Sequence, residues 1–111
     1  MTGRRDIMAE FRDYIDVEVH ESKVHRIAIA LGVSTRTLQS HCHKTFSISP
    51  KQFLLACRLH QARTSLMQPS EMTSVTGVAT NHGFDQLGRF SGKYRDFFGE
   101  TPSETLRRAR A

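Results

Sequence analysis

The sequence has no tryptophan, only two cysteines and three prolines, and no long apolar run. Cys42 and Cys57 are too few for a disulfide framework and do not form a CxxC metal-binding pair. A membrane-spanning helix needs about 20 consecutive apolar residues, and no stretch comes near that length. No charged-then-apolar signal segment opens the chain either. These absences predict a reduced, cytoplasmic protein with no membrane partner.

Signs of an enzyme are also missing. A chain of 111 residues can form one compact domain or two very small ones, with no room for a large active-site cleft. No nucleophile, base and orienting group occur in a recognisable arrangement, and the six histidines fall on unrelated faces. We therefore expect no enzymatic activity, no catalytic residue and no cofactor.

Acidic residues are absent from a long block of the chain. Residues 22–70 contain seven lysines and arginines and no aspartate or glutamate, and the net charge of the whole chain is +5. Solvated protein surfaces usually mix charges of both signs. An acid-free block predicts a surface for the phosphate backbone of a nucleic acid. The alternative is a basic helical protein-interaction module that binds an acidic protein.

Apolar residues recur at three- and four-residue steps, which predicts helices throughout the first half. The pattern predicts helices over about 5–18 and 23–31, the second of which Gly32 ends. Ser34 is expected to cap a third helix that runs to about Thr45. Ser49-Pro50-Lys51-Gln52 is a capping-box pattern that opens a long helix to about Met67.

The second half has the same kind of pattern and no alternation typical of a strand. We expect a short helix capped by Thr73 or Ser74 and ended by Gly83, a helix capped by Asp85 and ended by Gly99, and a last helix opened by the capping box Thr101–Glu104. The predicted fold class is therefore all-α with seven helices.

The two halves repeat each other. Ala28 and Gly32 recur 51 residues later as Ala79 and Gly83. An offset of 52 relates four further pairs: Leu38 and Phe90, Phe46 and Phe98, Ser49 and Thr101, Pro50 and Pro102. Each copy is a helix, a turn with glycine and a capped second helix, which is a helix-turn-helix. We expect helix-turn-helix subdomains at 1–48 and 70–111, joined by a connecting helix at 49–69.

The second half carries a specific set of residues in order: Gly83-Phe84, Phe90, Tyr94-Arg95, Phe98-Gly99 and Thr101-Pro102-Ser103. The first half contributes Ile27-Ala28, Gly32-Val33-Ser34, Leu38-Gln39, Ser49-Pro50 and Arg58-Leu59. Through these residues the chain resembles the DNA-binding domain of the AraC/XylS family of bacterial transcription regulators. The resemblance implies sequence-specific binding of double-stranded DNA in the bacterial nucleoid. It also implies activation through contact with RNA polymerase, and a sensor domain for an effector that these residues do not contain.

Four positions depart from the family pattern. Ser47 stands where the family usually has a helix-ending glycine, and Cys42 where it usually has phenylalanine. His41 replaces a commonly apolar residue, and His82 a frequent tryptophan. We therefore expect the first core to be less well filled than the second.

The first recognition helix can be oriented by 100° per residue. Leu38 and Cys42 are expected to point inward with Thr45 near them. The outward side then offers candidates for contact with base edges: Arg36, Thr37, Gln39, Ser40 and His43. Lys44 and Lys51 are the candidates for phosphate contact.

The second recognition helix is expected to bury Leu87, Phe90, Tyr94 and Phe97. Its outward face then consists of Gly88 and Gly92. Either the missing side chains let the helix backbone approach the DNA groove closely, or the glycines reflect evolutionary drift at surface positions. Side-chain contact with bases is assigned to the residues around these glycines: Gln86, Arg89, Ser91 and Arg95.

Two further groups of residues, a histidine-cysteine cluster and the C-terminal arginines, could each have a function. His41-Cys42-His43 is not expected to bind metal, because adjacent helical residues diverge by about 100° and no second ligand pair completes a tetrahedron. Arg107, Arg108 and Arg110 either add attraction to the phosphate backbone or form a frayed, solvated end.

Overall fold

The structure is a computed structural model that describes residues 4–111. These residues form seven α-helices: α1 (Ile7–Val17), α2 (Val24–Leu31), α3 (Thr35–Phe46), α4 (Pro50–Met67), α5 (Val75–Asn81), α6 (Leu87–Phe98) and α7 (Pro102–Arg110). No strand occurs among the described residues. The predicted all-α fold is confirmed. The chain divides into two compact units, one up to Cys57 and one from Arg58 onward, so that α4 begins in one and ends in the other.

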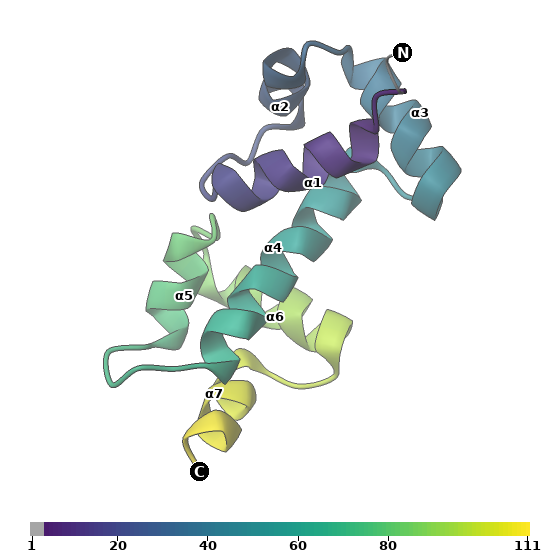
Figure 1. Ribbon diagram of the computed structural model, residues 1–111. Coiled ribbons are helices and arrows are strands. Elements are labelled where there is room, and N and C mark those ends of the chain that lie inside the picture. The colour runs from purple at the N-terminus through teal and green to yellow at the C-terminus, as the bar shows by residue number, and fades with distance from the viewer. Residues whose placement is uncertain (1–3) are drawn as a thin grey trace. The chain divides into compact units, whose positions relative to one another are not determined.

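The first unit packs α1, α2 and α3 against one another, together with the start of α4 (Figure 1). Phe11, Ile15, Ile27 and Leu38 are fully buried in its core. Cys42 is fully buried as well, with its Sγ 3.8 Å from the Sδ atom of Met8. Burial, with a smaller effect of Cys57, raises the pKa of the Cys42 thiol to about 11. Cys42 therefore packs as a neutral, apolar side chain.

The second unit packs α5, α6 and α7 against one another around a row of aromatic rings. Phe84, Phe90, Tyr94 and Phe98 form a continuous series, with successive ring centroids 4.7, 5.7 and 4.7 Å apart. Tilted pairs at such separations gain more than their buried area alone provides. Phe90 and Tyr94 thereby set which side of α6 faces the core.

Most of the predicted caps are present. Ser34, Ser74 and Thr101 each accept a hydrogen bond from a backbone amide at the start of α3, α5 and α7. The capping box at the start of α4 is complete, since the Gln52 amide donates to Ser49 Oγ at 3.1 Å and the Ser49 amide to Gln52 Oε1 at 2.9 Å. These bonds satisfy amides that would otherwise have no partner.

The prediction that Asp85 caps α6 is wrong. The N-cap residue is Gln86, and its side chain makes no capping hydrogen bond. The helix begins at Leu87, one residue later than the Asp85 signal indicates, so Asp85 lies before the capping position. A cap preference of about 1 kcal/mol is a weak local signal, and it did not decide where the first turn of α6 forms.

Three inward assignments are also wrong. Thr45 is exposed, while Leu87 is 44% and Phe97 47% exposed. Thr45 and Phe97 lie in the last turn of their helices and Leu87 is the first residue of α6, so the helical angle alone does not decide whether these side chains are covered. The Phe97 ring instead meets the imidazole of His60 edge-on at 5.3 Å.

Ser47 ends α3 in the left-handed region, at φ 58°. Gly99 ends α6 at the equivalent place of the repeat, at φ 79°. A side chain in this conformation costs about 1–2 kcal/mol, partly offset by the greater flexibility of glycine in the unfolded chain. We therefore expect Ser47→Gly to raise the free energy of unfolding by about 0.5–1 kcal/mol. Urea denaturation would measure it.

Gly99→Ser is the matched control, because it makes the reverse change at the repeated position. It should lower the free energy of unfolding by a similar amount. Neutral effects at both positions would show that the left-handed conformation carries no strain in this chain.

Candidate nucleic-acid interface

The outward side of α3 carries the predicted polar residues. Arg36, Gln39, Ser40 and His43 are all exposed and are spaced at i, i+3, i+4 and i+7, which places them on one face of the helix. Leu38 and Cys42 are buried on the opposite side. The structure therefore brings four of the five predicted base-edge candidates of this helix together on an open surface.

Thr37 differs from the other candidates on α3. It is half-buried, and its hydroxyl lies 3.0 Å from the Ser34 hydroxyl that caps the helix. Its side chain is thus part of the cap. The two phosphate candidates, Lys44 and Lys51, are exposed, the latter in the first turn of α4.

On α6, Gln86, Arg89 and Arg95 are exposed and Ser91 is half-buried. A Cβ atom added at Gly88 or Gly92 would have nothing within 4 Å. Packing within the chain therefore does not require glycine at either position.

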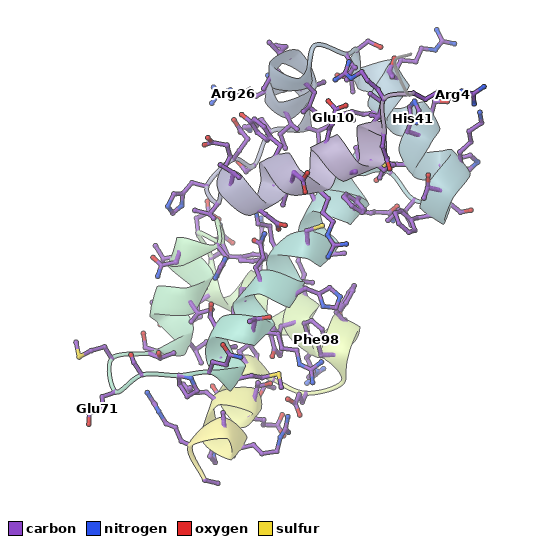
Figure 2. The ribbon with its side chains drawn as sticks, viewed as in Figure 1. Arg4, Glu10, Arg26, His41, Glu71 and Phe98 are labelled. Carbon is purple, nitrogen blue, oxygen red and sulfur yellow. The ribbon has the colours of Figure 1, made fainter. Side chains whose placement is uncertain are left out.

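Exposed cations outside the predicted candidates include Lys93 and Arg26. Lys93 lies on α6 four residues after Arg89, so both occupy one edge of the helix. Arg26 on α2 points away from the ribbon (Figure 2). The i, i+4 spacing from Arg89 is the sequence signal that could have identified Lys93. To predict that Arg26 is exposed, one would have had to know how α2 is oriented.

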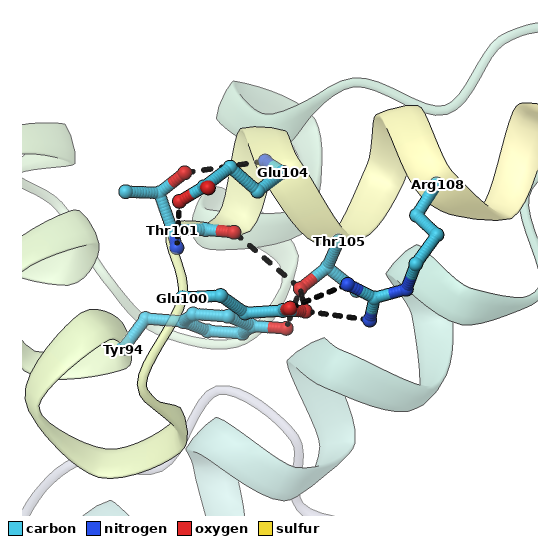
Figure 3. A network of polar contacts seen from close by, with 6 residues as sticks. All are labelled: Tyr94, Glu100, Thr101, Glu104, Thr105 and Arg108. Carbon is cyan, nitrogen blue, oxygen red and sulfur yellow. Dashed lines mark hydrogen bonds and ion pairs between the residues drawn. The ribbon is translucent and has the colours of Figure 1, made fainter.

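A polar network joins α6 to α7 (Figure 3). The Tyr94 and Thr105 hydroxyls lie 2.8 Å apart, and the Thr105 hydroxyl donates to the Glu100 carboxylate. Arg108 donates to both carboxylate oxygens of Glu100, at 2.5 and 2.8 Å. Bidentate pairing of a guanidinium with a carboxylate is both strong and directional.

The ion pair with Arg108, followed by the Thr105 hydroxyl, lowers the pKa of Glu100 to about 2. A carboxyl group with a lowered pKa stabilises the fold above its unfolded pKa of about 4.3, and this stabilisation is lost as the pH falls through the folded value. We expect the stability difference between the wild type and Glu100→Gln to shrink as the pH falls from about 4 to about 2. Urea denaturation at a series of pH values would measure it.

Glu71→Gln is the control for this pH dependence, because Glu71 is exposed and points away from the ribbon (Figure 2). Its stability difference should change less over the same range. An equal change in the two variants would mean that the Glu100 network is not the cause.

The C-terminal arginines are not a frayed end. α7 continues to Arg110, whose Nη2 donates to the carbonyl oxygens of Ser70 at 3.0 Å and Thr73 at 2.7 Å. Arg108 is paired with Glu100, whereas Arg107 is exposed. Two of the three arginines thus hold the second unit together.

Among residues 4–111, no three histidine, cysteine, aspartate or glutamate side chains are grouped so that they could hold a metal ion. No helix within this range combines the length and hydropathy needed to cross a membrane.

Comparison with known proteins identifies the domain. A family model described as a helix-turn-helix domain matches residues 27–108. A probable AraC family transcriptional regulator from Rhodopseudomonas palustris is 32% identical and superposes with a TM-score of 0.81, covering 96% of this chain and 100% of that one. The chain belongs to the AraC/XylS family. Its paired helix-turn-helix units form a DNA-binding domain of the type found in transcription regulators.

Further relatives of this AraC/XylS-type chain are regulators as well. The XylDLEGF operon transcriptional activator of Pseudomonas putida is 36% identical over 88 residues, which are 78% of this chain and 27% of that protein. The probable thc operon regulatory protein of Rhodococcus erythropolis is 34% identical over 97 residues, which are 86% of this chain and 29% of that protein. The chain thus spans less than a third of the length of these two relatives.

Proposed function

We propose that this domain recognises a specific sequence of double-stranded DNA, with α3 and α6 each entering a major groove. The main support for this proposal is the exposed face of α3, where Arg36, Gln39 and Ser40 lie together. Arginine pairs with guanine and glutamine with adenine in two-pronged hydrogen bonds, and serine bonds to either base. On α6 the proposed readers are Gln86, Arg89, Ser91 and Arg95. Lys44 and Lys51 are proposed to contact phosphates.

In vitro selection of duplexes with this chain is the direct test. An enriched sequence that unrelated duplexes of equal charge cannot displace would support specific recognition. Equal competition by every duplex would instead favour the view that the basic surface serves an acidic protein partner.

The two helix-turn-helix units are proposed to occupy successive major grooves on one side of the duplex. The 18 residues of α4 correspond to a helix of about 27 Å. Successive grooves lie about 34 Å apart, a distance that slight bending of the DNA can match. We expect footprinting of a monomer on one asymmetric site to show two protected grooves. Protection confined to one groove would contradict the proposal.

We also propose that the protein containing this domain acts in the bacterial nucleoid and activates transcription through contact with RNA polymerase. This proposal is supported by a relative that is named as a transcriptional activator. A transcription assay with purified polymerase and the selected site would show increased transcript when the protein is added. A reduced or unchanged amount of transcript would contradict this part of the proposal.

A further inference from the structure

We propose that Glu100 is a positioning residue for DNA recognition, because its carboxylate fixes the orientation of α6 through Thr105 and Tyr94. This inference rests on the proposed role of α6 as a reader of bases. None of the three residues belongs to the outward face of α6.

The hydrogen bonds of this network run in one direction (Figure 3). The Glu100 carboxylate can only accept, so the Thr105 hydroxyl donates its single proton to it. Thr105 must then accept from the Tyr94 hydroxyl at 2.8 Å. Both hydroxyls belong to buried residues, with Tyr94 0% and Thr105 1% exposed. A buried hydroxyl that loses its partner destabilises the fold, so the network favours one arrangement of α6 against α7.

The start of α6 has few other contacts that could fix its orientation. Its N-cap residue Gln86 makes no side-chain capping bond, and Leu87 is 44% exposed. Gly88 and Gly92 have no side chain to pack. Buried Phe90 resists movement away from the core, but aromatic packing is less directional than a hydrogen bond. The bond at Tyr94 therefore adds a directional constraint to the aromatic packing of Phe90 and Tyr94, and the two together fix the rotation of α6 and with it the direction of Arg89.

The other end of the network is anchored on α7. Glu100 accepts from Nη1 and Nη2 of Arg108, and the neighbouring residue Thr101 forms a complete capping box with Glu104. The carboxylate is thus held by two residues of α7, Arg108 and Thr105, and the Thr105 hydroxyl links it to the hydroxyl of Tyr94.

Thr105→Val tests the proposal, since valine matches threonine in shape and lacks the hydroxyl. Binding would be measured against a panel of single-base-substituted sites at two salt concentrations. We expect the preference at the base pairs of the α6 half-site to fall by about three- to tenfold, the equivalent of one hydrogen bond. The preference in the α3 half-site and the salt dependence should stay unchanged.

Thr105→Ser is the conservative control, because it keeps the hydroxyl and should keep the preference. An equal loss of preference in both half-sites, or a Thr105→Val variant with wild-type preference, would overturn the proposal. A wild-type chain with no base preference in the α6 half-site would instead contradict the proposed function itself.

Glu100→Gln provides a second route if Thr105→Val does not fold. The neutral side chain weakens the network and should reduce the same α6 preferences. If this variant instead bound every duplex more tightly, with a steeper salt dependence, Glu100 would merely be keeping the charge of Arg108 from the phosphates. That result would overturn the positioning role.

Discussion

Replacement of Arg36 by alanine is expected to weaken binding to the preferred DNA site by about 1–3 kcal/mol and to relax the preference at one or two base pairs. Arg36 is exposed in the first turn of α3, and the buried side chains of Leu38 and Cys42 hold the helix from the opposite side. Its removal should therefore leave the fold intact. Binding to a panel of single-base-substituted sites would measure both effects.

Lys51→Ala is the matched control for Arg36→Ala. Lys51 is also exposed, but it lies in the first turn of α4 rather than on a recognition helix. Its loss should weaken all duplexes about equally and lower the salt slope by about one. If Arg36→Ala also lowered affinity uniformly, with no change at any base pair, α3 would not be the reader proposed here.

Phe90→Ala is expected to destabilise the second unit by about 3–5 kcal/mol. Phe90 is fully buried, and its ring contacts Phe84 and Tyr94 at centroid separations of 4.7 and 5.7 Å. Alanine would leave a cavity in the middle of the aromatic series. Native-state hydrogen exchange should then show loss of protection in α5, α6 and α7, with α1–α3 protected as before.

Phe97→Ala is the control on the same helix, because Phe97 is 47% exposed. Its cost should be clearly smaller than that of Phe90→Ala. Equal loss of protection in both units of Phe90→Ala would show that they open together, contrary to the proposed division into two subdomains.

The repeated pattern of caps and glycines made most of the fold predictable. Ser34, Ser74, Ser49 and Thr101 act through amides within the next three residues, so their roles are visible in local sequence. The wrong predictions for side chains near helix ends have a different origin. A helical angle places Leu87 on the core side, but whether anything covers it depends on neighbours far away in the chain.

The candidate interface was predictable to a similar extent. The exposed face of α3 follows from two buried positions and the helical period. The engagement of Thr37 with Ser34 could have been inferred only from the rotamers of both side chains. The network of Glu100, Thr105 and Tyr94 depends on how α7 packs against α6, for which the sequence contains no local signal.

The buried thiol of Cys42 has a practical consequence for experiments. With its pKa raised to about 11, it presents almost no thiolate at neutral pH, and the surrounding core excludes reagents. Alkylation of Cys42 can therefore proceed only through molecules in which the first unit has opened. The rate of Cys42 alkylation, followed by mass spectrometry, therefore reports local unfolding of the unit that carries α3.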